Sequence, residues 1–357
     1  MKKIIILLIL LIPINVFALE TSATSAILMD LDNNRIIYSK DIHNIRSVAS
    51  ISKIMTALLA VESGKLNDNV TIGEEINSAY GSGIYIQVGE NMRLIDLVYG
   101  LMLRSGNDAA LAIAKYVGGS VDDFVVMMND KAKEIGMKNT TFNNPSGLDQ
   151  DKGNYSTAYD MALLTSYAMK NEDYKKIVGT KNYKLKTDKN YYSWINKNKL
   201  LHSYRYTTGG KTGYTEIARR TLVTTATQNG VNLVAVTLND GNDFQDHKNM
   251  HEYGFNNYTN YKILSKGDIT IIDENYYLGY SFYINNDFNY ILTDDEKNTI
   301  KLKFLLEKDI NKKDGDIVGK VHVYVLDKEV HSQDVYLKKE KIVKKNILQK
   351  ILDWFRK

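Results

Sequence analysis

Three short groups of serine, lysine and asparagine residues lie in a particular order along the chain. The first is Ser50-Ile51-Ser52-Lys53, the second is Ser105-Gly106-Asn107 and the third is Lys211-Thr212-Gly213. A serine hydroxyl is a weak nucleophile until a nearby base removes its proton, and lysine is one of the side chains that can do so. Each group alone would carry little information, because Ser and Lys are common. Together they predict an acyl-transfer site with a serine nucleophile.

Ser50 and Lys53 are predicted to share one face of a helix, because they are three residues apart and the following apolar residues repeat at helical spacing. Ser50 would lie near the start of that helix, where free backbone N–H groups can stabilise a developing oxyanion. A lysine acts as a base only when it is neutral, which requires burial or a second cation nearby. Lys211 is the candidate second cation. An ordinary helix start would also explain Ser50 and Lys53, and the other two groups favour the catalytic interpretation.

Ser105 and Asn107 follow an apolar stretch at 94–103 and are expected in a loop between two helices. The Ser105 hydroxyl could relay a proton to a leaving amine, and the Asn107 amide could hold both a lysine and a substrate carbonyl. A cap for the helix that begins near Ala109 is an alternative role, and the two roles are compatible.

Lys211, Thr212 and Gly213 precede a predicted hairpin and are expected on an edge strand that faces the site. A cation and a hydroxyl suit a substrate carboxylate, and Gly213 would permit close approach of the substrate backbone. A solvated turn before a strand is the alternative for this group alone. Gly210-Lys211-Thr212 also resembles the end of a phosphate-binding loop, but that motif requires a glycine where Arg205 stands.

The pattern around these groups predicts an α+β fold. Segments 26–29 and 35–38 flank a turn-forming Asp-Asn-Asn, and segments 220–226 and 231–238 flank an Asn-Gly turn, so both pairs are expected to be hairpins. Between them the apolar spacing is mainly helical. We therefore expect one antiparallel sheet flanked by helices over residues 19–260. Short alternating stretches separated by turn residues then predict a small all-β, sandwich-like domain at 261–338.

The two ends have different compositions from the body of the chain. Residues 1–18 combine a basic start, an apolar run and Val16-Phe17-Ala18 at the cleavage positions, which predicts a signal peptide cleaved after Ala18 and an exported protein. An uncleaved anchor is the alternative. Residues 339–357 place apolar and aromatic side chains on one half of a helical wheel and mostly basic ones on the other. This pattern, which holds from Lys345 onward, predicts a membrane-binding amphipathic helix, and a helix docked on the preceding β domain is the alternative.

Charge and cysteine content exclude several classes of protein. The last twenty residues carry a net charge of +6, whereas the rest of the mature chain is slightly acidic, which argues against a nucleic-acid partner. The chain has no cysteine, so disulfides, thiol nucleophiles and thiolate metal sites are excluded. No serine lies in a Gly-x-Ser-x-Gly elbow. His247 and His251 have the spacing of helical metal ligands, but an exposed amphipathic helix is the expected explanation, and no metal site is predicted.

With these groups in place, the chain resembles the D-alanyl-D-alanine carboxypeptidases, the low-molecular-mass penicillin-binding proteins. The resemblance runs from about residue 24 to the tail and includes segments 49–56, 105–110, 144–148 and 210–215. It implies a β-lactamase-like catalytic domain, a β-sandwich module, a terminal membrane-binding helix on the outer face of the cytoplasmic membrane, and no metal or organic cofactor. The implied reaction removes the terminal D-alanine from peptidoglycan pentapeptide stems, with acylation by β-lactams.

The same resemblance implies individual roles. Ser50 would be the acylated nucleophile and Lys53 its general base, while Ser105 and Asn107 would assist proton transfer and substrate positioning. Lys211 and Thr212 would receive the terminal carboxylate. The backbone N–H groups of Ser50 and Tyr214 would form the oxyanion hole.

The chain departs from many relatives where they carry Ala-Gly after the Lys-Thr-Gly strand, since Ala218-Arg219-Arg220 stands here. A serine β-lactamase is the nearest rival, but no glutamate occurs between Glu134 and Glu172, across the segment where such an enzyme would carry its deacylating base. An endopeptidase with the same residues and a catalytically inactive wall-binding module also remain open.

Overall fold

The computed structural model describes residues 19–149, 152–271, 276–277, 279–309 and 311–339. The expected signal peptide and terminal amphipathic helix lie outside these residues. The described chain forms two compact units. The first extends to Asn256 apart from Asn229–Val231, and the second begins at Asn257.

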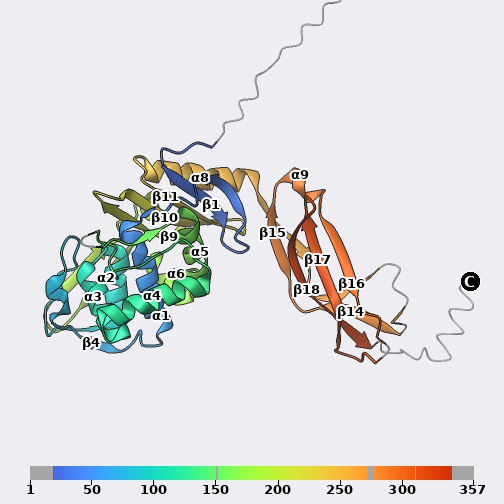
Figure 1. Ribbon diagram of the computed structural model, residues 1–357, viewed down its shortest axis with the longest axis horizontal. Coiled ribbons are helices and arrows are strands. Elements are labelled where there is room, and N and C mark those ends of the chain that lie inside the picture. Colours follow the sequence, from blue (N-terminus) through green and yellow to red (C-terminus); the bar gives the residue numbers. More distant parts are fainter. Residues whose placement is uncertain (1–18, 150–151, 272–275, 278, 310, 340–357) are drawn as a thin grey trace, which may run out of the picture. The chain divides into compact units, whose positions relative to one another are not determined.

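The first unit is built on a five-stranded antiparallel sheet (Figure 1). In spatial order the strands are β2 (Ile36–Lys40), β1 (Ser25–Asp30), β11 (Val231–Leu238), β10 (Arg219–Gln228) and β9 (Thr207–Thr215). Both predicted hairpins are confirmed. The tight turn between β10 and β11 places Asn229 and Gly230 at φ +50 and +77, the left-handed values that an Asn-Gly hairpin turn requires. Strand β9, which carries Lys211, lies at the edge as predicted.

Helices cover both faces of this sheet (Figure 1). Helix α8 (Asp243–Asn257) lies on one face. The other helices of the unit are η1 (Ala49–Ser52), α1 (Lys53–Glu62), η2 (Glu74–Ser78), α2 (Leu94–Arg104), α3 (Asn107–Gly118), α4 (Val121–Ile135), α5 (Ala158–Ala168), α6 (Glu172–Val178) and α7 (Leu200–Ser203). Three two-stranded ladders complete it: β3 (Arg46–Ser47) with β6 (Tyr155–Ser156), β4 (Asn69–Thr71) with β5 (Asn91–Arg93), and β7 (Asn182–Lys186) with β8 (Tyr191–Ile195).

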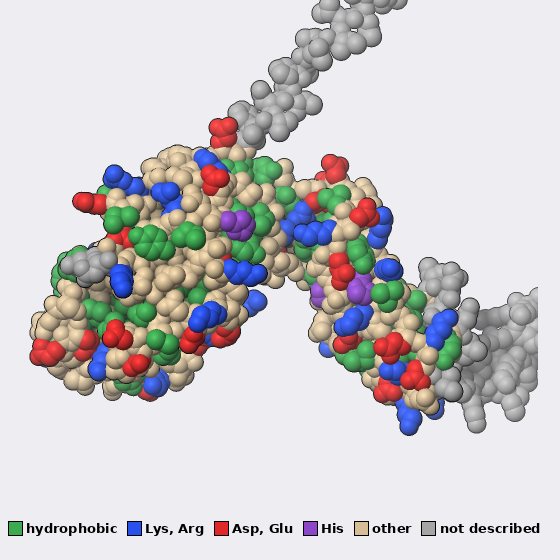
Figure 2. All heavy atoms as spheres, in the orientation of Figure 1, with side chains coloured by type: hydrophobic (Ala, Val, Ile, Leu, Met, Phe, Trp, Pro, Cys, Tyr) green, Lys and Arg blue, Asp and Glu red, His purple; other side chains and the backbone are tan. Residues whose placement is uncertain are grey.

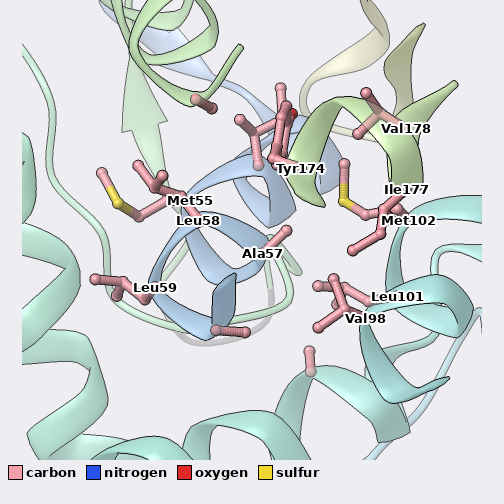
Figure 3. Packing of buried hydrophobic residues seen from close by; sticks show 14 of the residues in the cluster. Met55, Ala57, Leu58, Leu59, Val98, Leu101, Met102, Tyr174, Ile177 and Val178 are labelled. Atoms are coloured by element: carbon pink, nitrogen blue, oxygen red, sulfur yellow. The ribbon is translucent and has the colours of Figure 1, made fainter. Parts of the chain in front are cut away.

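Helix α1 runs through the centre of the main hydrophobic core. Its residues from Lys53 to Val61 are all buried. Side chains from α2 and α6, including Leu101 and Ile177, pack around its apolar residues (Figure 3). Burial of each leucine or isoleucine side chain contributes roughly 1.5–3 kcal/mol to the free energy of folding. The first turn of α1 therefore belongs to a firmly packed helix.

Helix α8 corrects one expectation from the sequence. His247 and His251 do not lie on an exposed face, because both side chains are fully buried against the sheet. The Thr224 hydroxyl lies 2.7 Å from His247 Nδ1 and 2.8 Å from His251 Nε2, and Thr237 Oγ1 lies 3.0 Å from His247 Nε2. Threonines on β10 and β11 therefore supply the polar partners that allow an otherwise polar helix to bury its histidines.

The second unit contains a five-stranded sheet and a two-stranded sheet. The larger has the order β13 (Gly267–Ile269), β14 (Tyr280–Ile284), β18 (Lys328–Lys339), β17 (Ile317–Val325) and β16 (Lys301–Leu306), and the smaller pairs β12 (Thr259–Leu264) with β15 (Phe288–Leu292). Apolar residues from both sheets share one core, which includes Leu292, Val323 and Leu337. A one-turn helix, α9 (Asp294–Lys297), interrupts the strands, which the alternating pattern did not predict.

Figure 2 shows the distribution of charged side chains on one face of the molecule. On the face shown in Figure 2, basic and acidic side chains are interspersed on each unit, and no broad basic area appears among the residues described there. Within the described residues, no helix is both long enough and apolar enough to span a bilayer.

Candidate active site

The turn η1 brings Ser50 and Lys53 together at the start of α1. Lys53 Nζ lies 3.0 Å from Ser50 Oγ. Ala49, immediately before the serine, has φ +49, a left-handed conformation that is rare for a residue with a side chain and is concentrated at functional sites. Ser50 is half-buried, whereas Lys53 is completely buried. The serine is thus accessible and its neighbouring amine is shielded from water.

The hydrogen bonds of Lys53 fit a neutral amine. Nζ lies 2.7 Å from Asn107 Oδ1 and also contacts the backbone carbonyl oxygen of Ser146. Both oxygens can only accept, so they use the two N–H groups of a neutral amine. The remaining lone pair faces the Ser50 hydroxyl, which can donate. This is the arrangement that a general base needs before it removes a proton from serine.

Electrostatics favour the same state of Lys53. Burial, followed by the charges of Lys211 and Lys197, holds the pKa of Lys53 well below its usual value, and the carboxylate of Asp108 acts weakly in the opposite direction. Burying an ammonium without a paired anion is costly, so the proton is lost instead. The structure therefore supplies both conditions named from the sequence, which were burial and a second cation.

Ser105 lies where α2 ends and α3 begins. It takes the left-handed conformation, with φ +66, and Gly106 N–H bonds back to the Gly100 carbonyl at 3.3 Å. This helix ending directs the Ser105 hydroxyl to Lys211, whose Nζ lies 3.1 Å away. Lys211 also contacts the Thr212 carbonyl at 2.6 Å. Burial and then the charge of Lys197 lower the pKa of Lys211 to about 7.

Asn107, the first residue of α3, connects the first two groups. Its Oδ1 accepts from Lys53, and its Nδ2 donates to the Tyr80 carbonyl at 2.6 Å, which fixes the orientation of the amide. The neighbouring Asp108 carboxylate accepts from Ile84 N–H at 3.0 Å and from Tyr85 N–H at 2.6 Å. Asn107 and Asp108 thereby hold the 80–86 loop beside the site.

Strand β9 passes directly beside the serine turn. A Cβ added to Gly213 would lie 3.0 Å from the Ser50 backbone nitrogen and 2.4 Å from Thr221 Oγ1. From the sequence, Gly213 is expected to permit close approach of the substrate backbone. In the structure, the atoms that need this space belong to η1 and β10, so the glycine permits the packing of β9 against the nucleophile. Thr212 is half-buried and Tyr214 is exposed.

These residues surround an open pocket of about 400 Å³. Its lining consists of Ser50, Ser82, Ser105, Lys197, Thr212, Gly213, Tyr214, Arg220, Asp243 and Phe244. Lys53, Asn107 and Lys211 lie behind this wall. A larger hollow of about 720 Å³ lies among α5, α6 and the ends of β9 and β10, but it does not include the serine–lysine pair.

The sequence did not predict three contributions to the site, which are the Ser146 carbonyl, the Thr56 hydroxyl and the Lys197 side chain. The Ser146 carbonyl contacts Lys53, and the turn that carries it is held by Thr56 Oγ1, which donates to the Pro145 carbonyl at 2.7 Å. Lys197 lines the pocket and lies 3.3 Å from Ser82 Oγ. A backbone carbonyl has no sequence signature, and an isolated lysine 14 residues before Lys211 has no motif around it.

Comparison of the chain with known proteins identifies the family to which it belongs. Residues 14–242 match the model of the Peptidase_S11 family, described as D-alanyl-D-alanine carboxypeptidase. The chain belongs to the D-alanyl-D-alanine carboxypeptidase family. Its match to the family model contains all three sequence groups and the pocket lining as far as Arg220, and it ends just before Asp243 and Phe244.

Named relatives agree with this assignment. The D-alanyl-D-alanine carboxypeptidase DacF of Bacillus subtilis is 39% identical over 227 residues, which are 62% of this chain and 58% of that protein. DacA of Haemophilus influenzae is 30% identical over 362 residues, 94% of this chain and 89% of that protein. The crystal structure of penicillin binding protein 5 from Haemophilus influenzae has a TM-score of 0.76 and 27% identity, and the match covers 90% of this chain and 98% of that one. The predicted α+β fold of the D-alanyl-D-alanine carboxypeptidases is thus confirmed.

Proposed function

We propose that this carboxypeptidase removes the terminal D-alanine from peptidoglycan stem peptides through an acyl-enzyme on Ser50. The observation that carries the proposal is the 3.0 Å approach of Lys53 Nζ to Ser50 Oγ, with Lys53 fully buried among acceptors that suit a neutral amine. The family assignment supplies the reaction class, and the pocket geometry supports the choice of residues.

In the first half-reaction, Lys53 takes the Ser50 proton while Oγ attacks the carbonyl carbon of the D-Ala-D-Ala bond. The backbone N–H groups of Ser50 and Tyr214 would hold the resulting oxyanion. When the C–N bond breaks, the proton passes from Lys53 to the leaving nitrogen with the Ser105 hydroxyl as a relay. Lys211, 3.1 Å from Ser105 Oγ, orients this hydroxyl.

In the second half-reaction, Lys53 is neutral again and takes a proton from water as the water oxygen attacks the acyl carbon. Ser50 Oγ then leaves and recovers the proton from Lys53. Thr212 and the positive field of Lys211 favour the free carboxylate of the substrate, and Asn107 orients Lys53 and the substrate carbonyl. Gly213 keeps β9 against the serine turn.

Penicillins are expected to acylate Ser50 and to leave slowly. No glutamate occurs in the 144–148 turn. The next acid, Asp149, accepts from Ser47 Oγ at 2.6 Å and from Thr215 Oγ1, so both of its carboxylate oxygens are engaged. A free carboxylate that could activate a deacylating water, as class A β-lactamases have, is therefore not supplied from this turn.

We further propose that the protein is exported and held on the outer face of the cytoplasmic membrane. The basic and apolar segment at 1–18 and the basic amphipathic segment at 339–357 support this proposal. The interspersed charges on the face shown in Figure 2 do not form the broad basic area that nucleic-acid binding would require.

Intact-protein mass spectrometry tests the proposed function directly. The purified protein should gain one penicilloyl mass and should release D-alanine from an N-acylated peptide that ends in D-Ala-D-Ala. Ser50→Ala should abolish both, with an unchanged fold. Rapid multiple turnover of penicillin would instead favour a β-lactamase, and full function in Ser50→Ala would favour a non-catalytic wall-binding protein.

A further inference from the structure

The cation assigned to the substrate carboxylate does not reach the pocket. Lys211 is 1% exposed, and its Nζ is already bonded to Ser105 Oγ and to the Thr212 carbonyl. It is absent from the pocket lining, whereas Thr212 is present. Lys211 can therefore contribute a field, but the direct charged partner of a carboxylate that enters the pocket must come from another residue.

Arg220 occupies a suitable position. In the β9–β10 ladder it lies directly opposite Tyr214, and Leu222 lies opposite Thr212. Opposed residues of an antiparallel pair, and alternate residues of one strand, share a face of the sheet. Thr212, Tyr214 and Arg220 therefore project from the same face at the edge, and all three line the pocket.

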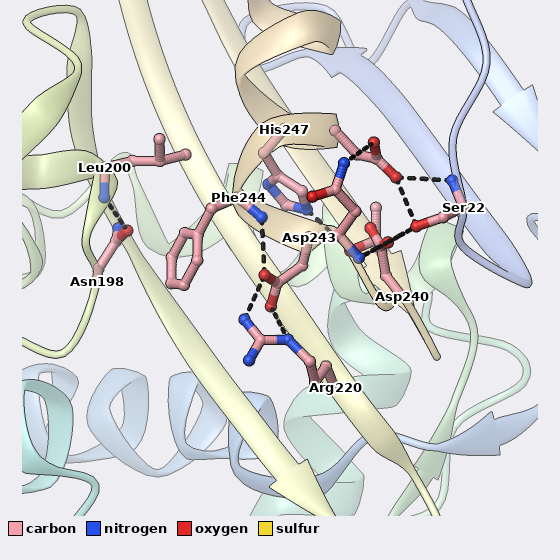
Figure 4. A network of polar contacts seen from close by, with 11 residues as sticks. Ser22, Asn198, Leu200, Arg220, Asp240, Asp243, Phe244 and His247 are labelled. Atoms are coloured by element: carbon pink, nitrogen blue, oxygen red, sulfur yellow. Dashed lines mark hydrogen bonds and ion pairs between the residues drawn. The ribbon is translucent and has the colours of Figure 1, made fainter.

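Asp243 fixes the guanidinium group from the first turn of α8 (Figure 4). Arg220 Nε lies 3.1 Å from Asp243 Oδ2, and Nη2 contacts Oδ1 at 2.5 Å. The Asp243 side chain is 5% exposed and the Arg220 side chain is 46% exposed. Phe244 adds a ring 5.6 Å from the guanidinium carbon. One edge of the guanidinium is thus held by a buried carboxylate.

The other edge remains available to a ligand. A guanidinium has five N–H donors, and Asp243 uses two of them. Within the described part of the chain, no second acceptor contacts Arg220, and one terminal nitrogen carries no contact in Figure 4. Arginine stays charged throughout the working pH range and matches the two oxygens of a carboxylate.

We propose that Arg220, oriented by Asp243, binds the free carboxylate at the C-terminal end of the substrate together with Thr212. This inference rests on the proposed function and deepens it. An endopeptidase substrate has a peptide bond where this carboxylate would be, so Arg220 makes the enzyme prefer carboxypeptidase substrates. Asp243 is a positioning residue, since it acts through the guanidinium.

Lys197 is the alternative cation on the pocket wall. Its Nζ lies 3.3 Å from Ser82 Oγ, and burial followed by the charge of Arg104 lowers its pKa. Lys197 is therefore less reliably charged than Arg220, and its hydrogen bond is to the 80–86 loop rather than to an element of the β9–β10 edge.

The test compares two substrates that differ only at the terminal group. One is an N-acylated peptide ending in D-Ala-D-Ala, and the other is its C-terminal amide. Release of D-alanine and of D-alanine amide gives kcat/KM for each. In Arg220→Gln, the ratio of acid to amide should fall about 10- to 100-fold, as expected for loss of one charge-assisted hydrogen bond, while the amide value changes less than about 3-fold.

Matched variants separate recognition from structure. Arg219→Gln removes the adjacent, exposed positive charge, which does not line the pocket, and should leave the ratio unchanged. Arg220→Lys keeps a charge but loses the two-pronged geometry, so the ratio should fall by a smaller factor. Asp243→Asn should lower the ratio of acid to amide modestly, because the guanidinium loses its fixed orientation. Because Arg220→Gln leaves a buried carboxylate unpaired, the double variant Arg220→Gln with Asp243→Asn removes both partners and should show the same fall in the ratio.

Several outcomes would overturn the proposal. Equal losses for the acid and the amide would assign Arg220 a structural role, and an unchanged ratio in the folded double variant would exclude carboxylate binding. A fall of the ratio in Lys197→Gln but not in Arg220→Gln would transfer the role to Lys197. The proposed function fails separately, through a wild-type protein that neither acquires penicillin on Ser50 nor releases D-alanine.

Discussion

Gly213 in β9 and Ser50 in η1 approach so closely that a Cβ on Gly213 would lie 3.0 Å from the Ser50 backbone nitrogen. This nitrogen is one of the two proposed oxyanion donors. The contact therefore links the position of the third sequence group to the geometry of the nucleophile.

Gly213→Ala should slow catalysis more than it destabilises the fold. The added methyl group also meets Thr221 Oγ1, so the strand or the serine turn must move, at a cost of about 1–3 kcal/mol. Displacement of one oxyanion donor should lower the rate of penicillin acylation by about 100-fold. Gly241→Ala is the matched control, since a Cβ there meets nothing within 4 Å. Equal acylation rates for the two variants would contradict the inferred packing role.

Lys211→Gln should move the pH dependence of acylation toward higher pH. Lys211 repels a proton on Lys53, so removing this charge raises the pKa of Lys53 and extends the inactive, protonated range upward. The second-order rate of penicillin labelling, followed from about pH 5 to about pH 10, reports the acid limb. Lys197→Gln should shift it in the same direction by less, because Lys197 is the weaker of the two influences. A shift toward lower pH would contradict Lys53 as the base.

Acid should destabilise the protein partly through His247 and His251. Burial lowers the pKa of His251 to about 3, and burial with the neighbouring His251 lowers that of His247. Between about pH 3 and the unfolded value near 6.5 the unfolded chain binds the proton and the folded chain does not, so stability falls as pH falls, by up to about 1.4 kcal/mol per pH unit for each group.

His251→Phe isolates one of these contributions. Phenylalanine keeps a ring where His251 lies parallel to Tyr204 and Phe255, but it cannot titrate. Loss of the Thr224 contact should cost about 1 kcal/mol at pH 7. The free energy of urea unfolding should then fall less between pH 7 and pH 5 than in the wild type. An unchanged pH dependence would show that His251 is protonated in the folded protein.

Deletion of Lys341–Lys357 should release the protein from membranes. The segment carries the basic and apolar faces on which the proposed anchoring depends. D-alanine release from a small soluble peptide should persist, because every pocket residue lies before it in the first unit. Retention of the truncated protein in the membrane fraction would locate the anchor elsewhere in the chain.

The fold was largely predictable because its local signals are strong. The Asn229-Gly230 turn predicted the β10–β11 hairpin, and helical spacing of apolar residues predicted α1, α2 and α4. Helix α8 was different, since its buried His247 and His251 depend on threonines of β10 and β11 that only the tertiary structure places beside them.

The candidate site was predictable to the extent that side chains form short motifs. Ser50, Lys53, Ser105, Asn107 and Lys211 meet in the structure through the contacts described above. Ser146 contributes a backbone oxygen, which any residue type could provide.

Lys197 and Arg220 act from isolated positions whose proximity to the pocket depends on chain folding. Arg220 could be noted as a departure from a pattern, but its register opposite Tyr214 and its pairing with Asp243 required coordinates.

The position of β9 at the edge of the sheet affects which peptide substrates the enzyme can bind and distinguish. Within the described residues no strand pairs with its outer side, so main-chain groups there are open to a sixth strand, apart from the Thr212 carbonyl, which already accepts from Lys211. An extended peptide could align on this template through main-chain groups alone. Such pairing does not depend on the side chains of the peptide. Selectivity among peptides would therefore depend on contacts to the two ends of the ligand and not to its central residues.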